Sequence, residues 1–149
     1  MAHSYTSTLI HCVFSTKERR KTIQPELQAE LWTYMGGIAR TRKMKALAVG
    51  GIEDHAHILL LLPSNVAVAS AVQKIKAGSS KWLHEARRQR DFEWQEGYGA
   101  FSIGISQAPA TVSYILQQKA HHLKQDFCEE YLGFLAKHQI EYDPRFGWG

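Results

Sequence analysis

The amino-acid sequence predicts a single α+β domain, in which an antiparallel sheet carries its helices on one face. The hydrophobic pattern changes repeatedly between short β-branched or aromatic runs and longer runs with three- and four-residue spacing. The length of 149 residues suits one hydrophobic core, so we expect one domain over residues 1–149. Hydrophobic residues make up 44% and charged residues 21% of the chain, a balance typical of globular and not of disordered proteins.

The chain begins with a predicted strand and a predicted helix. Residues 5–14 are rich in Tyr, Thr, Ile, Val and Phe, which favours a strand, and the charged residues 17–21 predict a basic turn. Pro25 opens a helix that we expect to end near Arg40. The apolar face of this helix is formed by Leu27, Leu31, Tyr34, Met35 and Ile38.

The middle of the chain predicts two strands and a second helix. Residues 46–62 fit two adjacent strands joined by a tight turn at residues 50–54. A helix over residues 66–88 follows, with an apolar side and a lysine-rich side. Gly78 weakens the middle of this helix because glycine is a poor helix former.

The last third predicts one more strand and two helices. Residues 92–106 are aromatic and glycine-rich, which indicates a loop that leads into an edge strand near residues 100–105. Helices are expected from Pro109 to about Leu123 and over residues 127–138, before an irregular tail at 141–149. The order strand, helix, two strands, helix, strand and two helices is close to a ferredoxin-like sandwich.

Basic residues are concentrated in the first part of the chain. Residues 1–90 hold 14 Lys and Arg against 6 Asp and Glu, whereas residues 91–149 hold 4 against 8. If the fold gathers the basic clusters on one face, they form a binding surface for a phosphate backbone. Solvated helix ends explain the same charges equally well. The candidate DNA-binding residues are Arg19, Arg20, Lys74, Lys76 and Lys81.

Several common features are missing from the sequence. No apolar run approaches the roughly 18 residues that span a bilayer, and the first residues lack a signal-peptide pattern, so we expect a cytoplasmic protein without a membrane partner. Cys12 and Cys128 have no CxxC partner, which favours buried free thiols over a disulfide or a zinc site. No glycine-rich phosphate loop is followed by Lys-Ser/Thr, so no nucleotide cofactor is expected.

The tripeptide His55-Ala56-His57 is a candidate metal site. Successive side chains alternate on a strand, so both imidazoles project from one face and can hold one metal ion. Two histidines alone leave open positions for a third protein ligand and for substrate oxygens. Ordinary histidines on a sheet face are the alternative interpretation, although unpartnered imidazoles beside the apolar run that follows would be costly if buried.

A second candidate group lies on the helix that starts at Pro109. Tyr114 and Gln118 are four residues apart and share one helical face, with His121 and His122 about one turn further along. A tyrosine phenol is a poor nucleophile near neutral pH, so covalent chemistry at Tyr114 needs an activated phosphate nearby. The alternative is an amphipathic helix that packs Tyr114 together with Ile115 and Leu116.

Taken together, these motifs resemble the single-tyrosine HUH transposases of the smallest bacterial insertion sequences, including the REP-associated tyrosine transposases. The resemblance covers nearly the whole chain. The matching segments are Gly50–Leu60, Lys76–Trp82, Trp94–Ser102, Tyr114-Ile115 with Gln118 and His121-His122, and the ending from Glu130-Tyr131-Leu132 through Tyr142–Phe146.

The resemblance implies a role for each matching residue. His55 and His57 would bind a divalent cation, Mg²⁺ or Mn²⁺, with Gln118 as the third ligand. Tyr114 would attack a phosphodiester of single-stranded DNA and form a 5′-phosphotyrosine, and the released 3′-OH would later rejoin strands. The family also implies recognition of a DNA hairpin, a homodimer with merged sheets, and action at the bacterial nucleoid.

The sequence departs from the expected family pattern at two places. Lys119-Ala120 follows Gln118 where many relatives have acidic residues, which could change the affinity for the cation or the choice of cation. Ala56 is smaller than the usual branched residue between the histidines, but its side chain faces away from them.

Three other functions compete with a mobile transposase. A domesticated single-strand nuclease would keep the same residues and differ only in genomic surroundings. A non-catalytic nucleic-acid-binding module of the same shape lacks the aromatic run that such sheets use to stack bases. The third alternative is a zinc hydrolase or deaminase that uses His55 and His57. The deaminase pattern needs a Glu beside the first ligand and a downstream CxxC, and both are missing.

Overall fold

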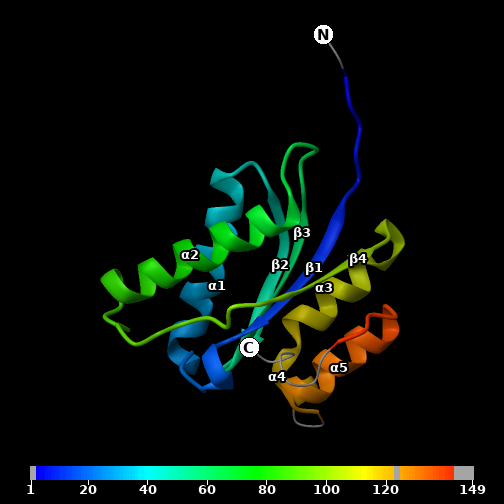
Figure 1. Ribbon diagram of the computed structural model, residues 1–149. Coiled ribbons are helices and arrows are strands. Elements are labelled where there is room, and N and C mark those ends of the chain that lie inside the picture. The colour runs from blue at the N-terminus through cyan, green and yellow to red at the C-terminus, as the bar shows by residue number, and fades with distance from the viewer. Residues whose placement is uncertain (1–2, 123–124, 143–149) are drawn as a thin grey trace.

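The computed structural model describes residues 3–122 and 125–142 and contains a four-stranded antiparallel sheet (Figure 1). The strand order is β2-β3-β1-β4. The strands are β1 (Leu9–Ser15), β2 (Lys45–Ile52), β3 (His55–Leu61) and β4 (Gly99–Ile103). The predicted α+β class and antiparallel sheet are therefore confirmed, and β4 lies at an edge as the sequence indicated.

The pairing of the two central strands, β1 and β3, sets which residues lie next to His55 and His57. In the pairing of β1 with β3, Ser15 lies opposite His55 and Val13 lies opposite His57. β2 and β3 are joined by a tight turn, as predicted, and Gly50 lies opposite His57 on the other side. Both central strands are almost entirely buried because each has a partner on both edges and helices on both faces.

One face of the sheet is covered by α1 (Pro25–Thr41) and α2 (Val68–Ala86). The core beneath these helices includes Ile10, Cys12, Phe14, Ala56, Ile58 and Leu60 from the strands and Leu31, Met35, Val72, Ile75 and Leu83 from the helices. Gly78 has a packing reason to be in α2, because a Cβ at this position would lie 2.8 Å from Ile38 Cδ1 of α1. Glycine thus lets the two helices approach closely.

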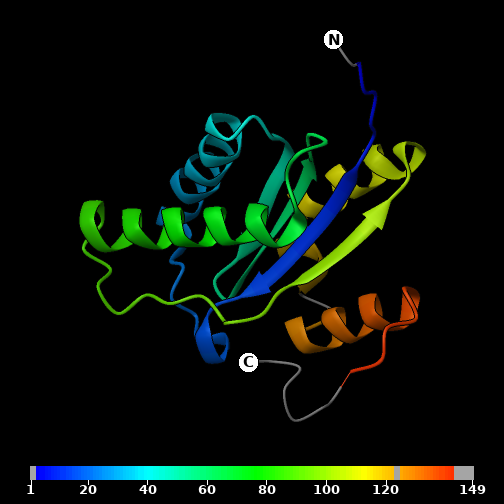
Figure 2. The ribbon, with the colours of Figure 1, turned by 45° about the horizontal axis from the view of Figure 1, so that its top comes forward.

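Helices also cover the opposite face, which differs from the expectation that they lie on one face. Figure 2 shows α1 and α2 on one side of the sheet and α3 (Ala108–Leu116) and α5 (Phe127–Lys137) on the other. The physical reason is that β1, β3 and β4 also carry apolar side chains on this face, next to His11, His55 and His57. These apolar strand residues are Leu9, Val13, Leu59 and Phe101, and they pack against Ile115, Phe127, Tyr131 and Leu135.

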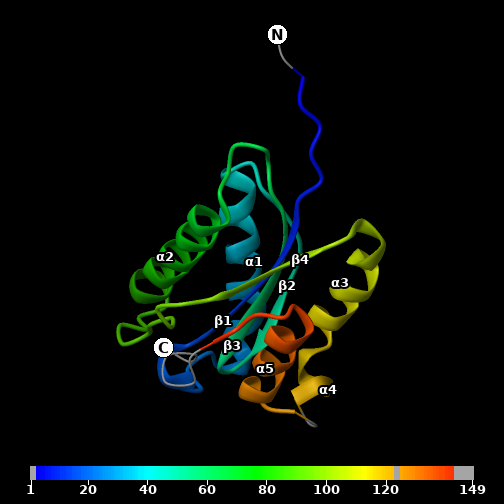
Figure 3. The same cartoon turned by 45° about the vertical axis from the view of Figure 1, so that its right-hand side comes forward.

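The helix predicted from Pro109 to about Leu123 is divided. The chain leaves helical geometry at Gln117, with φ −110° and ψ 32°, and resumes as α4 (Gln118–His122), which lies below α3 and beside α5 in Figure 3. The predicted end at Leu123 lies outside the described residues, as do the side chains of residues 121 and 122 and the tail 143–149.

Close backbone contact fixes the position of α3 on the sheet. A Cβ at Gly50 of β2 would lie 2.4 Å from the carbonyl oxygen of Ile115. Only a glycine therefore lets the last turn of α3 approach β2 this closely. Tyr114 precedes Ile115, so a larger residue at position 50 would also displace the tyrosine.

The structure also shows the environment of the two cysteines and the form of the basic turn. Cys12 is buried and Cys128 is half-buried, and both are free thiols, so the expected burial holds fully for Cys12 alone. The basic turn is the short 3-10 helix η1 (Lys17–Arg19). Within the described residues, no helix combines the length and apolar character needed to cross a bilayer.

Candidate active site

Strand β3 places His55 and His57 side by side on the face covered by α3 and α5. Both side chains are fully buried. Each ring uses its Nδ1 to contact a neighbouring residue: His55 Nδ1 is 2.7 Å from Asp54 Oδ1, and His57 Nδ1 is 2.8 Å from His11 Nε2. The two Nε2 atoms point to a common centre, because both lie near one carboxylate oxygen of Glu130.

Glu130 comes from α5 and was not predicted as a site residue. Its Oε1 lies 3.0 Å from His57 Nε2 and 3.4 Å from His55 Nε2, and the side chain is buried. One atom from each of these three residues lies within 4.8 Å of the others, close enough to hold one metal ion. One signal was available in the sequence, namely a carboxylate on the same side of a helix as Phe127 and Phe134.

The structure also brings Tyr114 and Gln118 to this centre. The Tyr114 hydroxyl donates a hydrogen bond to Glu130 Oε2. Gln118 Oε1 lies 3.1 Å from His55 Nε2, and Gln118 Nε2 donates to the Tyr114 carbonyl oxygen at 3.0 Å. The four residues selected from the sequence thus lie together, even though the helix that was expected to carry two of them is interrupted at Gln117.

The pKa values show which protonation states this centre favours. Burial lowers the pKa of His55, but its hydrogen bonds to Asp54 and Glu130 outweigh this and raise the pKa to about 9. Burial raises the pKa of Tyr114, and Glu130 raises it further, so the phenol is protonated at neutral pH. The centre therefore stabilises positive charge beside a neutral tyrosine, which suits a bound cation.

A pocket of about 540 Å³ gives access to the tyrosine. It lies between α3, α5 and β4, and Tyr114 and Glu130 form part of its wall. Polar side chains in its lining include Ser102, Ser106 and Thr111. The pocket thus reaches Tyr114, whereas His55 and His57 are fully buried.

The candidate DNA-binding residues do not gather at this centre. Lys74, Lys76 and Lys81 lie on α2, which covers the other face of the sheet. Arg20 forms an exposed ion pair with Glu18 at 3.2 Å. Arg19 acts electrostatically on the Cys128 thiol, so its charge lies near the start of α5.

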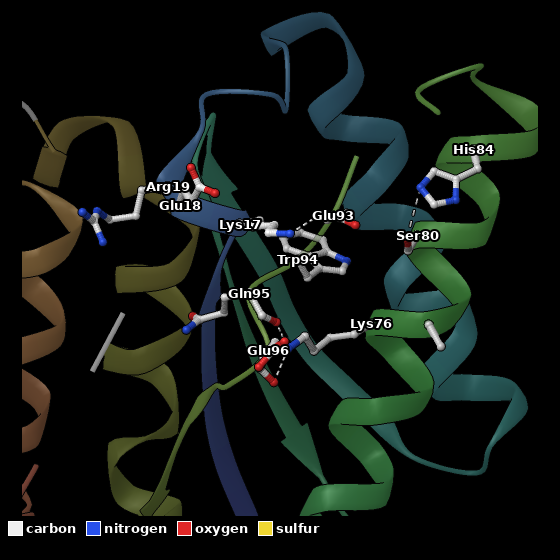
Figure 4. Close-up of a pocket in the computed structure, with 11 residues that line it drawn as sticks. Lys17, Glu18, Arg19, Lys76, Ser80, His84, Glu93, Trp94, Gln95 and Glu96 are labelled. Atoms are coloured by element: carbon white, nitrogen blue, oxygen red, sulfur yellow. Dashed lines mark hydrogen bonds and ion pairs between the residues drawn. The ribbon is translucent and has the colours of Figure 1, made fainter. Parts of the chain in front are cut away.

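Lys76 lines a second pocket, of about 850 Å³, between α2, η1 and residues 93–96 (Figure 4). Its ammonium donates hydrogen bonds to the carbonyl oxygens of Gln95 and Gly97, the latter at 2.9 Å. Burial lowers the pKa of Lys76 to about 8. Arg19 extends away from Lys76 and Trp94 in this view. The structure therefore shows Lys76 anchoring a loop, whereas Lys74 and Lys81 are exposed.

Comparison with known proteins shows which family the sequence matches. The sequence model described as IS200-like transposase matches residues 4–118. The transposases for insertion sequence element IS200 of Salmonella typhimurium and Salmonella typhi are each 27% identical over 139 residues, which covers 89% of this chain and 88% of each relative.

Two solved structures share the fold. One, described as a transposase from Deinococcus radiodurans, has a TM-score of 0.63 at 18% identity and covers 77% of this chain and 94% of its own. The other, a REP-associated tyrosine transposase bound to a REP hairpin, has a TM-score of 0.60 at 17% identity and covers 82% of this chain and 73% of its own. Because the family match spans most of the chain, this protein belongs to the IS200-like transposase family.

Proposed function

We propose that this transposase cuts and rejoins single-stranded DNA through a 5′-phosphotyrosine formed by Tyr114. One observation carries the proposal: the Tyr114 hydroxyl and the Nε2 atoms of His55 and His57 meet at the two oxygens of one buried carboxylate, Glu130. A nucleophile beside a group of metal ligands is the arrangement that attack on a phosphodiester requires.

The residues at this centre suit a divalent cation of the Mg²⁺ or Mn²⁺ type. His55 and His57 would supply imidazole nitrogen, and Glu130 and Gln118 would supply oxygen. A mixed set of oxygen and imidazole ligands fits Mn²⁺, and oxygen ligands fit Mg²⁺. When bound, the cation supplies charge neutralisation for the non-bridging oxygens of the phosphate.

In the cleavage step, the Tyr114 oxygen forms a bond to phosphorus while the bond between phosphorus and the 3′ oxygen breaks. Glu130 Oε2 already accepts the hydrogen bond of the phenol and takes its proton as the bond forms. The leaving 3′ oxygen receives a proton from solvent. The phosphodiester is exchanged for a phosphotyrosine ester, so attack by a 3′-OH reverses the step without a nucleotide cofactor.

The substrate we propose is a DNA hairpin with a flanking single strand at the end of an insertion element. One structure of the same fold is described as bound to a REP hairpin, which supports extending hairpin binding to this chain.

We also propose a homodimer, because in the described residues β4 pairs only with β1 and leaves a free sheet edge. A domesticated nuclease would use the same chemistry on a fixed genomic hairpin.

The test is covalent capture of labelled DNA. The protein is incubated with a single-stranded oligonucleotide that carries the hairpin end of its own element, with Mg²⁺ or Mn²⁺ and then with a chelator. We expect a metal-dependent protein–DNA adduct that Tyr114→Phe abolishes. Tyr142→Phe is the matched control, because Tyr142 is 46% exposed and should leave the adduct unchanged. Hairpin binding without any adduct would contradict the proposal and would indicate a non-catalytic DNA-binding module.

A further inference from the structure

In both metal-site histidines, one ring nitrogen faces Glu130 and the other contacts a different residue. His55 and His57 both direct Nε2 toward Glu130 and hold Nδ1 against another residue. For His55 this residue is Asp54, whose carboxylate can only accept a hydrogen bond. For His57 it is the imidazole of His11, which can accept or donate according to its tautomer.

We infer that His11 is a positioning residue, which accepts a hydrogen bond from His57 Nδ1 and so keeps His57 Nε2 directed at the cation. The inference rests on the proposed function, since it assigns a role at the same metal centre. A nitrogen that binds a metal ion carries no proton, so a neutral His57 bound through Nε2 must carry its proton on Nδ1. The atom 2.8 Å away, His11 Nε2, must then be the acceptor.

His11 can accept this hydrogen bond only as a neutral imidazole, because the charged ring carries a proton on both nitrogens. A neutral imidazole has one bare nitrogen and one N–H. If the bare nitrogen is Nε2, the proton of His11 is on Nδ1, and the His57–His11 pair has a single consistent arrangement.

The surroundings of His11 would favour an apolar side chain if packing alone decided. On this face of β1, His11 stands between Leu9 and Val13, and its partner across the sheet is Leu59. Its side chain is nevertheless an imidazole that is only 4% exposed. Phe134 holds the ring edge-on at a centroid distance of 5.1 Å, which leaves little freedom to rotate away from His57. A buried polar ring of this kind needs its hydrogen bond.

Removal of the His11 side chain and removal of the Asp54 side chain should have different effects on the metal centre. Removing the Asp54 carboxylate takes a negative charge from the centre and weakens cation binding through electrostatics as well as orientation. Removing the neutral His11 ring changes no charge. The effect of His11 should therefore appear in the position of the His57 proton and in metal affinity, without a general change in the field of the site.

The test compares His11→Phe, which keeps a ring but no acceptor, with His11→Gln, whose amide oxygen can accept. NMR of the ¹⁵N-labelled protein loaded with Mg²⁺, which is diamagnetic, should show a coupling across the His57–His11 hydrogen bond, with the proton bonded to His57 Nδ1. Mn²⁺ affinity, measured by calorimetry, should fall about 10- to 100-fold in His11→Phe and only a few-fold in His11→Gln. His138→Gln, which removes an imidazole stacked on Phe101, should keep the wild-type affinity.

Two results would overturn the inference: a proton bonded to His11 Nε2 in the Mg²⁺-loaded protein, or wild-type Mn²⁺ affinity in a folded His11→Phe variant. Failure of the proposed function looks different. In that case the wild-type protein would form no adduct, or His57→Ala would leave Mn²⁺ binding unchanged. The proton position in the Mg²⁺-loaded protein would still decide the direction of the hydrogen bond between His57 and His11, whether or not an adduct forms.

Discussion

The hydroxyl of Tyr114 donates a hydrogen bond to the carboxylate of Glu130, and this bond connects α3 to α5 directly beside the two histidines. One oxygen of Glu130 thus faces the nucleophile and the other faces the metal ligands. The carboxylate is the point at which the covalent chemistry and the cation would meet.

Glu130→Gln should lower the rate of adduct formation about 10²- to 10⁴-fold, because the amide cannot accept the phenol proton. Mn²⁺ affinity should fall as well, since a neutral amide replaces an anionic ligand. Single-turnover cleavage and calorimetry measure the two effects. Glu129→Gln is the matched control, because Glu129 is the preceding residue of α5 and is exposed. Equal rates for both variants would exclude Glu130 from the reaction.

The stability of the metal-free protein should fall between pH 6.5 and 9. The pKa of His55 is about 9 in the folded protein against 6.5 for a free histidine, so its contribution is fully present below pH 6.5 and is lost as the pH rises through 9. The contribution is on the order of 3 kcal/mol. Urea unfolding in chelator, at several pH values, measures this loss.

The variant Asp54→Asn shows how much of the pH dependence of stability comes from His55 and how much from other titrating groups. The variant removes one of the two carboxylates that raise the pKa of His55, so the loss of stability should be smaller and should occur at lower pH. Lys76, whose pKa is lowered to about 8, contributes in the opposite direction and equally in both proteins. Identical curves for wild type and variant would contradict the assignment to His55.

Gly50→Ala should move the tyrosine helix and reduce cleavage. The new methyl group would lie 2.4 Å from the carbonyl oxygen of Ile115, so α3 has to shift away from β2. We expect a loss of about 1–3 kcal/mol in stability and a larger proportional loss of adduct formation. At Gly36 in α1 the nearest atom to an added Cβ is 4.0 Å away, so Gly36→Ala should be neutral or slightly stabilising.

Lysines on α2 should divide into two classes. Lys76→Ala removes the anchor of residues 95–97, and we expect a loss of roughly 1–3 kcal/mol in the free energy of unfolding. Lys81→Ala should leave stability unchanged. If Lys81 contacts a phosphate, this variant should lower the slope of log affinity against log salt by about 1. Denaturation and hairpin binding at several salt concentrations distinguish the two classes.

The sequence predicted the parts of the site that depend on local spacing. His55 and His57 share a strand face, and Tyr114 and Gln118 are separated by one helical turn, so either pair follows from periodicity alone. Their assignment to one centre came from the resemblance to a family. Glu130 was missed because it reaches the histidines through the packing of α5, and no short-range pattern connects it to β3.

The differences in the fold also have identifiable causes. The run Ile58-Leu59-Leu60-Leu61 is apolar on both sides, which is typical of a strand buried on both faces and could have predicted helices on the second face. The interruption at Gln117 could not be predicted, because neither a proline nor a glycine marks it. Lys76 resembles any basic residue of an exposed helix side until the loop at residues 95–97 is placed against it.

The antiparallel register of β1 and β3 has a consequence for folding. Side chains alternate along a strand, so a slip of one residue would turn both imidazoles of β3 into the apolar layer beneath α1 and α2. A misregistered molecule would bury two polar rings among aliphatic side chains and would present no nitrogen to a cation. Metal uptake would therefore discriminate correctly paired chains from misfolded compact ones, and could serve as an assay of folding quality during purification.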